Sequence, residues 1–253
     1  MSDMQISGLS KVFGGLRATD DVSFHIAPGT VHSIIGPNGA GKTTLLNLMT
    51  GIYEPTAGEV TLGGQSLLGK PFHARVAMGL GRTFQTPQIC HGMSAIENVM
   101  LGSHLGLDGR LLPSMLRLPG IVRGDEACRE AAAGWMRYVG LERYLDAEPG
   151  AMPYGALKRL EIARALAGKP RLILLDEPAA GLGATEKAEL SRLICRLRDE
   201  GVTAVLVEHD MKLVMSVSQH VVVLNYGKKL AEGTPDEVSR NPDVIAAYLG
   251  RTH

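Results

Sequence analysis

The sequence predicts an α/β fold with an antiparallel β N-terminal subdomain and an inserted α-helical subdomain. Short apolar runs separated by turn residues occupy the first part of the chain, which is typical of β-strands. The pattern becomes helical from about residue 94 to residue 164, most clearly over 126–139. Beyond Gly168, a residue suited to end a helix, strands and helices alternate as they do around a parallel sheet.

Local patterns place the individual elements. Strands are expected at residues 4–9, 22–26, 31–35, 59–62, 172–175, 202–207 and, as a hairpin, 221–224 with 230–231. Helices are expected at residues 45–49, 126–139, 160–167, 185–198, 235–239 and 242–249. The helix at 185–198 carries a stripe that should pack on a sheet, formed by Leu190, Leu193, Ile194 and Leu197.

Composition restricts the class of protein. Lys and Arg together number 26, as do Asp and Glu, so no basic field favours a nucleic-acid partner. Cys90, Cys128 and Cys195 are far apart, which disfavours a zinc site or a disulfide framework and suits a reducing compartment. Neither a secretory signal nor an apolar stretch of about 20 residues is recognised. We therefore expect a cytoplasmic protein whose role at any membrane depends on a partner.

A glycine-rich segment after the third predicted strand carries the strongest chemical prediction. It satisfies G-x-x-x-x-G-K-[ST] and consists of Gly36, Pro37, Asn38, Gly39, Ala40, Gly41, Lys42, Thr43 and Thr44. Backbone N–H groups of such a loop, together with the helix that follows, can hold a polyphosphate. Lys42 should reach the β- and γ-phosphates, and the Thr43 hydroxyl is a candidate Mg²⁺ ligand. The segment predicts a P-loop NTPase (RecA-like) core.

Two adjacent carboxylates follow the strand at 172–175. Asp176 is expected at the carboxyl end of that strand, where open α/β sheets bind their ligands, and is a second candidate ligand of Mg²⁺. Glu177 is then placed to polarise an attacking water. Together with the phosphate loop, this pair predicts hydrolysis of a nucleoside triphosphate.

Beyond these two motifs, the chain resembles over its whole length the ATP-binding subunits of ATP-binding-cassette (ABC) transporters. The resemblance implies ATP and Mg²⁺ as ligands and assigns roles to three further residues. It implies that Phe13 stacks on adenine, that Gln85 links Mg²⁺ and water to the helical subdomain, and that His209 senses the γ-phosphate. It thus implies a catalytic set of Lys42, Gln85, Glu177 and His209, with Gln85 as a further metal ligand.

The segment at the place of the family signature departs from the usual Leu-Ser-Gly-Gly-Gln. It reads Met-Pro-Tyr-Gly-Ala over residues 152–156, so Pro153 replaces the serine and offers neither hydroxyl nor N–H. Contacts to the γ-phosphate held by a facing subunit are then expected from the Tyr154 and Gly155 backbone. Gly183 likewise stands where Asn or Asp is common, in the loop 180–183 that should contact that subunit.

With these departures, the chain resembles the ATP-binding subunits of branched-chain (hydrophobic) amino-acid uptake systems. Two segments near its C-terminal end share the resemblance: residues 227–236, Gly-Lys-Lys-Leu-Ala-Glu-Gly-Thr-Pro-Asp, and residues 241–250, Asn-Pro-Asp-Val-Ile-Ala-Ala-Tyr-Leu-Gly. The resemblance implies one ABC domain over 1–253, with a nucleotide-binding core at 1–86 and 160–253 and a helical subdomain at 87–159. It implies a second ATPase subunit, identical or paralogous, a membrane permease and, indirectly, a periplasmic solute-binding protein. The chain would be peripheral on the cytoplasmic face of the inner membrane.

Several alternatives remain open at this point. Related systems for urea, short amides or aromatic acids share these marks, so the solute is not determined. A soluble cassette ATPase of DNA repair or translation usually has two cassettes or a long coiled coil, and a phosphate-loop kinase would not need the signature segment or His209. The unusual stretch at 105–124, rich in leucine, glycine and arginine, fits either local packing or a docking surface.

Overall fold

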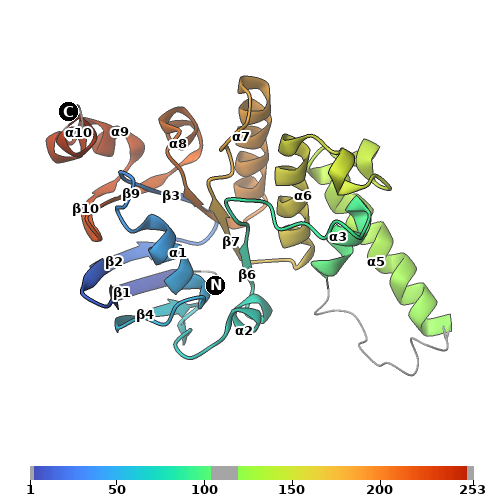
Figure 1. The fold of residues 1–253 in the computed structure, drawn as a ribbon, viewed down its shortest axis with the longest axis horizontal. Coiled ribbons are helices and arrows are strands. Elements are labelled where there is room, and N and C mark those ends of the chain that lie inside the picture. Colours follow the sequence, from blue (N-terminus) through green and yellow to red (C-terminus); the bar gives the residue numbers. More distant parts are fainter. Residues whose placement is uncertain (1–2, 104–118, 250–253) are drawn as a thin grey trace. The chain divides into compact units, whose positions relative to one another are not determined.

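A computed structural model describes residues 3–103 and 119–249. The chain forms two units: Met1–Gln85 with Arg171–His253, and Thr86–Pro170. The first unit therefore combines both ends of the chain, blue and orange to red in Figure 1. Most of the stretch at 105–124 lies outside the described residues.

The first unit contains an antiparallel sheet at the N-terminal end of the chain, as the sequence predicts. Its strands, in spatial order, are β2 (Leu16–Ile26), β1 (Met4–Phe13), β4 (Ala57–Leu62) and β5 (Gln65–Ser66). In β1, Met4 is opposite both Ile26 of β2 and Leu62 of β4. Strands β1 and β2 are longer than the apolar runs that predict them, because cross-strand pairing continues through their more exposed residues as far as Phe13 and Leu16.

A second sheet in this unit is parallel except at one edge. Its strands, in spatial order, are β10 (Lys228–Gly233), β9 (His220–Asn225), β3 (Val31–Ile35), β8 (Thr203–Val207), β7 (Leu172–Asp176) and β6 (Leu80–Arg82). Only β10, within the described residues, pairs antiparallel in this sheet. All residues of β3, β7 and β8 are buried, which explains why these strands read as continuous apolar runs rather than as alternating ones.

Helix α1 (Lys42–Thr50) shares one hydrophobic core with both sheets. That core joins Leu45 and Met49 of α1 to Ile6 of β1 and to Ile34 and Val222 of the parallel sheet. Alternate residues of the same parallel strands enter a second core with α8 (Met211–Val217), α9 (Pro235–Arg240) and α10 (Pro242–Leu249). The parallel sheet is therefore covered on both faces, with α1 on one of them. The unit also contains α2 (Phe72–Ala77) and α7 (Ala184–Asp199).

The second unit is helical. It comprises α3 (Ala95–Leu101), α5 (Pro119–Tyr138), α6 (Tyr154–Ala167) and the 3₁₀ turns η2 (Glu142–Tyr144) and η3 (Pro149–Ala151). Helices α3, α5 and α6 pack on one another. The first unit resumes at Arg171 rather than at residue 160, because α6 is one continuous helix that packs within the second unit.

None of the helices described is long and apolar enough to cross a bilayer.

Candidate functional site

Three adjacent strands of the parallel sheet end at the same edge. In register, Ile34 of β3 is opposite Val207 of β8, and Val207 is opposite Asp176 of β7. One or two residues beyond this row lie the start of the phosphate loop, His209 and Glu177. The strand order thus gathers at one edge the groups that the sequence singles out separately, at the position where open α/β sheets bind ligands.

Glycine backbone geometry shapes the phosphate loop. Gly36, Gly39 and Gly41 have φ values of 151°, 80° and 98°. A Cβ atom on Gly36 would lie 2.2 Å from the Leu224 carbonyl oxygen, and one on Gly41 would lie 2.3 Å from that of Ala18. Only glycine fits at these two positions. Helix α1 begins directly after Gly41, so its N-terminal N–H groups face this loop.

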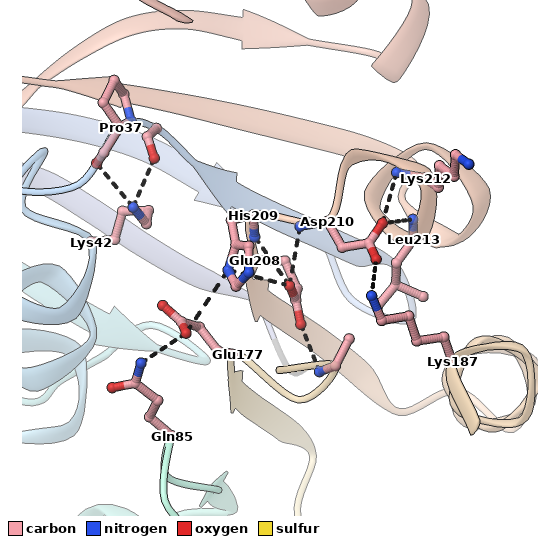
Figure 2. A network of polar contacts seen from close by, with 12 residues as sticks. Pro37, Lys42, Gln85, Glu177, Lys187, Glu208, His209, Asp210, Lys212 and Leu213 are labelled. Carbon is pink, nitrogen blue, oxygen red and sulfur yellow. Dashed lines mark hydrogen bonds and ion pairs between the residues drawn. The ribbon is translucent and has the colours of Figure 1, made fainter. Parts of the chain in front are cut away.

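Lys42 is folded into the loop that precedes it. Its Nζ atom donates hydrogen bonds to the carbonyl oxygens of Gly36 at 2.7 Å and Pro37 at 3.0 Å, and the side chain is buried (Figure 2). Thr43, the next residue, is exposed, as are Asn38 and Gly39. A positive charge therefore lies in the curve of the loop, and a hydroxyl group is accessible at the start of α1, an arrangement that suits a polyphosphate.

Asp176 is buried and paired with an arginine that the sequence did not identify as part of the site. Its carboxylate lies 3.2 Å from Nη2 of Arg82, and the side chains of the two residues are 6% and 2% exposed. Arg82 also donates from Nη1 to the Thr50 hydroxyl at 2.7 Å, at the last residue of α1. One guanidinium thus connects the carboxylate of β7 with the far end of the phosphate-loop helix.

Glu177 lies next to two of the other predicted catalytic residues. Its Oε2 atom accepts a hydrogen bond from Gln85 Nε2 at 2.8 Å and lies 3.9 Å from His209 Nδ1 (Figure 2). The φ angle of Glu177 is 46°, an uncommon left-handed conformation for a non-glycine residue. Such strain is typical of functional sites, where the surroundings impose the conformation.

Phe13 lies at the end of β1 and is 41% exposed. Its ring packs edge-to-face on Tyr53, with centroids 5.2 Å apart, and the Lys11 ammonium lies 5.1 Å from its centroid. These neighbours support the ring and leave part of it accessible to a planar ligand.

Tyr154 and Gly155 occupy the first turn of α6, in the second unit. The helix begins six residues earlier than the sequence predicts, and Pro153 is its N-cap. Ala156 and Leu157 are the first residues whose N–H groups bond back to the Pro153 carbonyl. The N–H groups of Tyr154 and Gly155 therefore belong to the open end of the helix, which is suited to an anion.

The oxygen donors at the site are of the kind that Mg²⁺ binds. Among the described residues, no group of three or more His, Cys, Asp or Glu side chains could hold a metal ion. Asp176, Thr43 and Gln85 offer oxygen donors, and Mg²⁺ typically binds through one or two carboxylates together with substrate phosphates and waters.

Arg82 and Glu208 are functional candidates that the sequence reasoning missed. Glu208 is fully buried and accepts three backbone hydrogen bonds. The signal available for Glu208 was a charged residue directly after a buried apolar strand, where it has little access to water, whereas the three-residue strand that ends at Arg82 carries no such pattern.

Comparison with known proteins identifies the family. A family model described as ABC transporter matches residues 19–180, and one described as branched-chain amino acid ATP-binding cassette transporter matches residues 228–253. The chain belongs to the ABC transporter family.

Relatives of similar length support this assignment. The chain is 45% identical to BraF of Pseudomonas aeruginosa and 42% identical to LivG of Escherichia coli, each a "high-affinity branched-chain amino acid transport ATP-binding protein". Both matches span 248 residues, 98% of this chain and 97% of the relative. The lipopolysaccharide export ATP-binding protein LptB of Acidithiobacillus ferridurans is 33% identical over 247 residues, 98% of this chain and 96% of LptB.

Solved structures confirm the predicted fold class. A nucleotide-free ATP-binding cassette of an ABC transporter matches with a TM-score of 0.86 and 30% identity, over 99% of this chain and 100% of the other. A dimeric post-hydrolysis cassette bound to ADP and phosphate matches with a TM-score of 0.79 and 26% identity, over 92% and 98%.

Proposed function

We propose that the chain is the ATP-hydrolysing subunit of an importer for branched-chain amino acids. The observation that supports this proposal most is that the phosphate loop and the contacting side chains of Gln85, Glu177 and His209 all lie at one edge of the parallel sheet, where neighbouring strands end. BraF and LivG, which are similar over nearly the full length, support the class of solute.

The phosphate loop and Lys42 bind the ATP phosphates in this proposal. When phosphates enter, the Lys42 ammonium exchanges the Gly36 and Pro37 carbonyl oxygens for phosphate oxygens, and loop N–H groups complete the contact. Asp176, Thr43 and Gln85 would hold Mg²⁺, which supplies neutralising charge to the phosphates.

Glu177 is the general base for the attacking water. Its carboxylate already accepts a hydrogen bond from Gln85, so one oxygen is oriented before water arrives. His209, 61% exposed in its side chain, is free to turn toward a γ-phosphate while remaining near Glu177. Phe13 provides a surface for the adenine ring.

A second ATPase subunit completes each site. The open N-terminus of α6, at Tyr154 and Gly155, would contact the γ-phosphate held by the facing subunit. We further propose that residues 86–98 bind a short helix of the permease, which receives solute from a periplasmic binding protein. The chain then lies peripherally on the cytoplasmic face of the inner membrane.

Two substitutions test this assignment. Glu177→Gln should keep ATP affinity within about threefold but lower the hydrolysis rate at least about 100-fold, because the base is lost, and should trap an ATP-bound dimer. Lys42→Ala should instead abolish nucleotide binding measured by calorimetry. Glu200→Gln, on the surface at the end of α7, serves as the matched control and should behave as wild type. Unchanged turnover in Glu177→Gln would contradict the general-base role.

The solute is tested separately. The solute-binding protein and permease that co-purify with the chain should bind leucine, isoleucine or valine by calorimetry. If these proteins instead bind urea, a short amide or an aromatic acid, the ATPase assignment would stand and the proposed solute would be wrong. Failure to recover a permease would argue against transport.

A further inference from the structure

Glu208 is a fully buried carboxylate directly before His209. Its Oε1 atom accepts a hydrogen bond from the Ala179 N–H at 2.7 Å. Its Oε2 atom accepts from the N–H groups of His209 at 3.0 Å and Asp210 at 3.3 Å (Figure 2). With 0% of the residue exposed, Glu208 is placed to bind backbone rather than nucleotide.

Burying a carboxylate is costly unless it is well hydrogen-bonded, and N–H bonds to a charged acceptor are stronger than neutral ones. The three bonds of Glu208 offset that cost, and they come from two different loops. The position therefore holds together two pieces of backbone, and an apolar side chain there would leave these backbone N–H groups without their acceptor.

The two loops are those that carry the proposed base and the proposed γ-phosphate sensor. The first runs from Glu177 past Ala179 to Gly183, and the second begins where β8 ends. The Glu177 N–H also donates to the Val207 carbonyl at 2.9 Å. Further out, Lys187 Nζ lies 2.7 Å from the Asp210 carboxylate. Glu208 forms the innermost of these links, with one oxygen bonded to each loop.

We propose that Glu208 is a positioning residue that fixes Glu177 and His209 relative to each other and joins both to the loop ending at Gly183. The inference rests on the proposed function and on the expectation, implied by the family resemblance, that the loop 180–183 contacts the second subunit. Movement of the loop on subunit closure is then transmitted through Ala179 and Glu208 to the His209 backbone. The side chains of Glu177 and His209 therefore reach their catalytic positions together.

Glu208→Gln tests the proposal because it keeps the side chain's shape but replaces one accepting oxygen with an NH₂ group. In the full-length chain, the hydrolysis rate at saturating ATP should fall about 10- to 100-fold while nucleotide affinity changes less than about threefold. Hydrogen exchange should accelerate together at Ala179, His209 and Asp210, and stay unchanged in β3.

Glu237→Gln is a matched control. Glu237 also accepts a backbone hydrogen bond, from the Thr234 N–H at 2.7 Å, but it caps α9 rather than joining two loops. This variant should increase exchange near Thr234 and leave the hydrolysis rate unchanged. Glu208→Asp keeps the charge with a shorter reach and should give an intermediate rate. It also decides the question if Glu208→Gln fails to fold.

A double variant separates positioning from general support of the fold. If Glu208 acts through His209, adding Glu208→Gln to His209→Ala should lower the rate less than the product of the two single effects. A wild-type rate in both Glu208 variants would overturn the inference. So would loss of rate in parallel with faster exchange throughout the sheet. Failure of the wild-type chain to hydrolyse ATP would instead contradict the proposed function itself.

Discussion

The phosphate loop and the neighbouring carboxylate edge, formed by Asp176, Glu177 and Glu208, obtain their geometry in different ways. The loop is shaped by its own backbone, through glycines at 36, 39 and 41, and Lys42 bonds to carbonyls within the same segment. The edge is held by contacts between segments far apart in sequence, such as Arg82 with Asp176. One region is locally determined, whereas the other exists only when the sheet is assembled.

The strongest way to disrupt the carboxylate edge is to remove its buried cation. Arg82→Met should lower the free energy of unfolding by about 3–5 kcal/mol, because it leaves a buried carboxylate without its guanidinium partner. Urea denaturation measures the loss. Arg17→Met provides a control, since Arg17 pairs with Asp20 at the surface and is 64% exposed, so a change within about 1 kcal/mol is expected. Equal effects of the two substitutions would show that burial does not decide the strength of the edge.

This difference also explains what the sequence could predict. The strand 31–35 is observed with the predicted bounds, and the loop glycines have the positive φ angles that such a motif requires. Both features could be predicted because each depends on contiguous residues. The short strand β6 was missed, since three residues such as Leu-Gly-Arg carry no periodic pattern. The contact of Arg82 with Asp176 could not be read from spacing, because it depends on β6 and β7 pairing in one register.

The same reasoning applies to the second unit. The helix that follows the signature segment was expected only from residue 160, and the segment itself was assigned no helical turn. In the structure Pro153 is the N-cap and Gly155 is buried in the first turn, positions that tolerate both residues. The predicted phosphate contacts of Tyr154 and Gly155 remain predictions, and they need a second subunit to test them.

A substitution in the loop should have a somewhat smaller effect, confined to one segment. Gly41→Ala should lower the free energy of unfolding by about 2–3 kcal/mol, because φ is 98° and the new Cβ would meet the Ala18 carbonyl oxygen. Gly39→Ala is the matched control: its φ is 80°, but nothing lies within 4 Å of the added atom. A loss of about 1 kcal/mol is expected there. Thermal unfolding with and without ATP measures both, and equal losses would mean that φ alone, not close packing, demands glycine.

The ion pair between Lys187 and Asp210, the outer link beside the carboxylate edge, should contribute least to stability. The pKa of Asp210 is lowered, first by the hydrogen bond from Lys187 and also by the backbone N–H groups of Leu213 and Lys212 that it caps. Asp210→Asn keeps a capping oxygen and loses the ion pair, so Tm at pH 7 should fall by no more than about 3 °C. Because the pKa is lowered in the folded state, the ion pair stabilises the protein above the usual range of an Asp carboxyl. The wild-type advantage should therefore shrink as the pH is lowered toward 3. An effect as large as that of Arg82→Met, or one that persists at low pH, would mean that the outer link carries as much of the edge as its buried pair does.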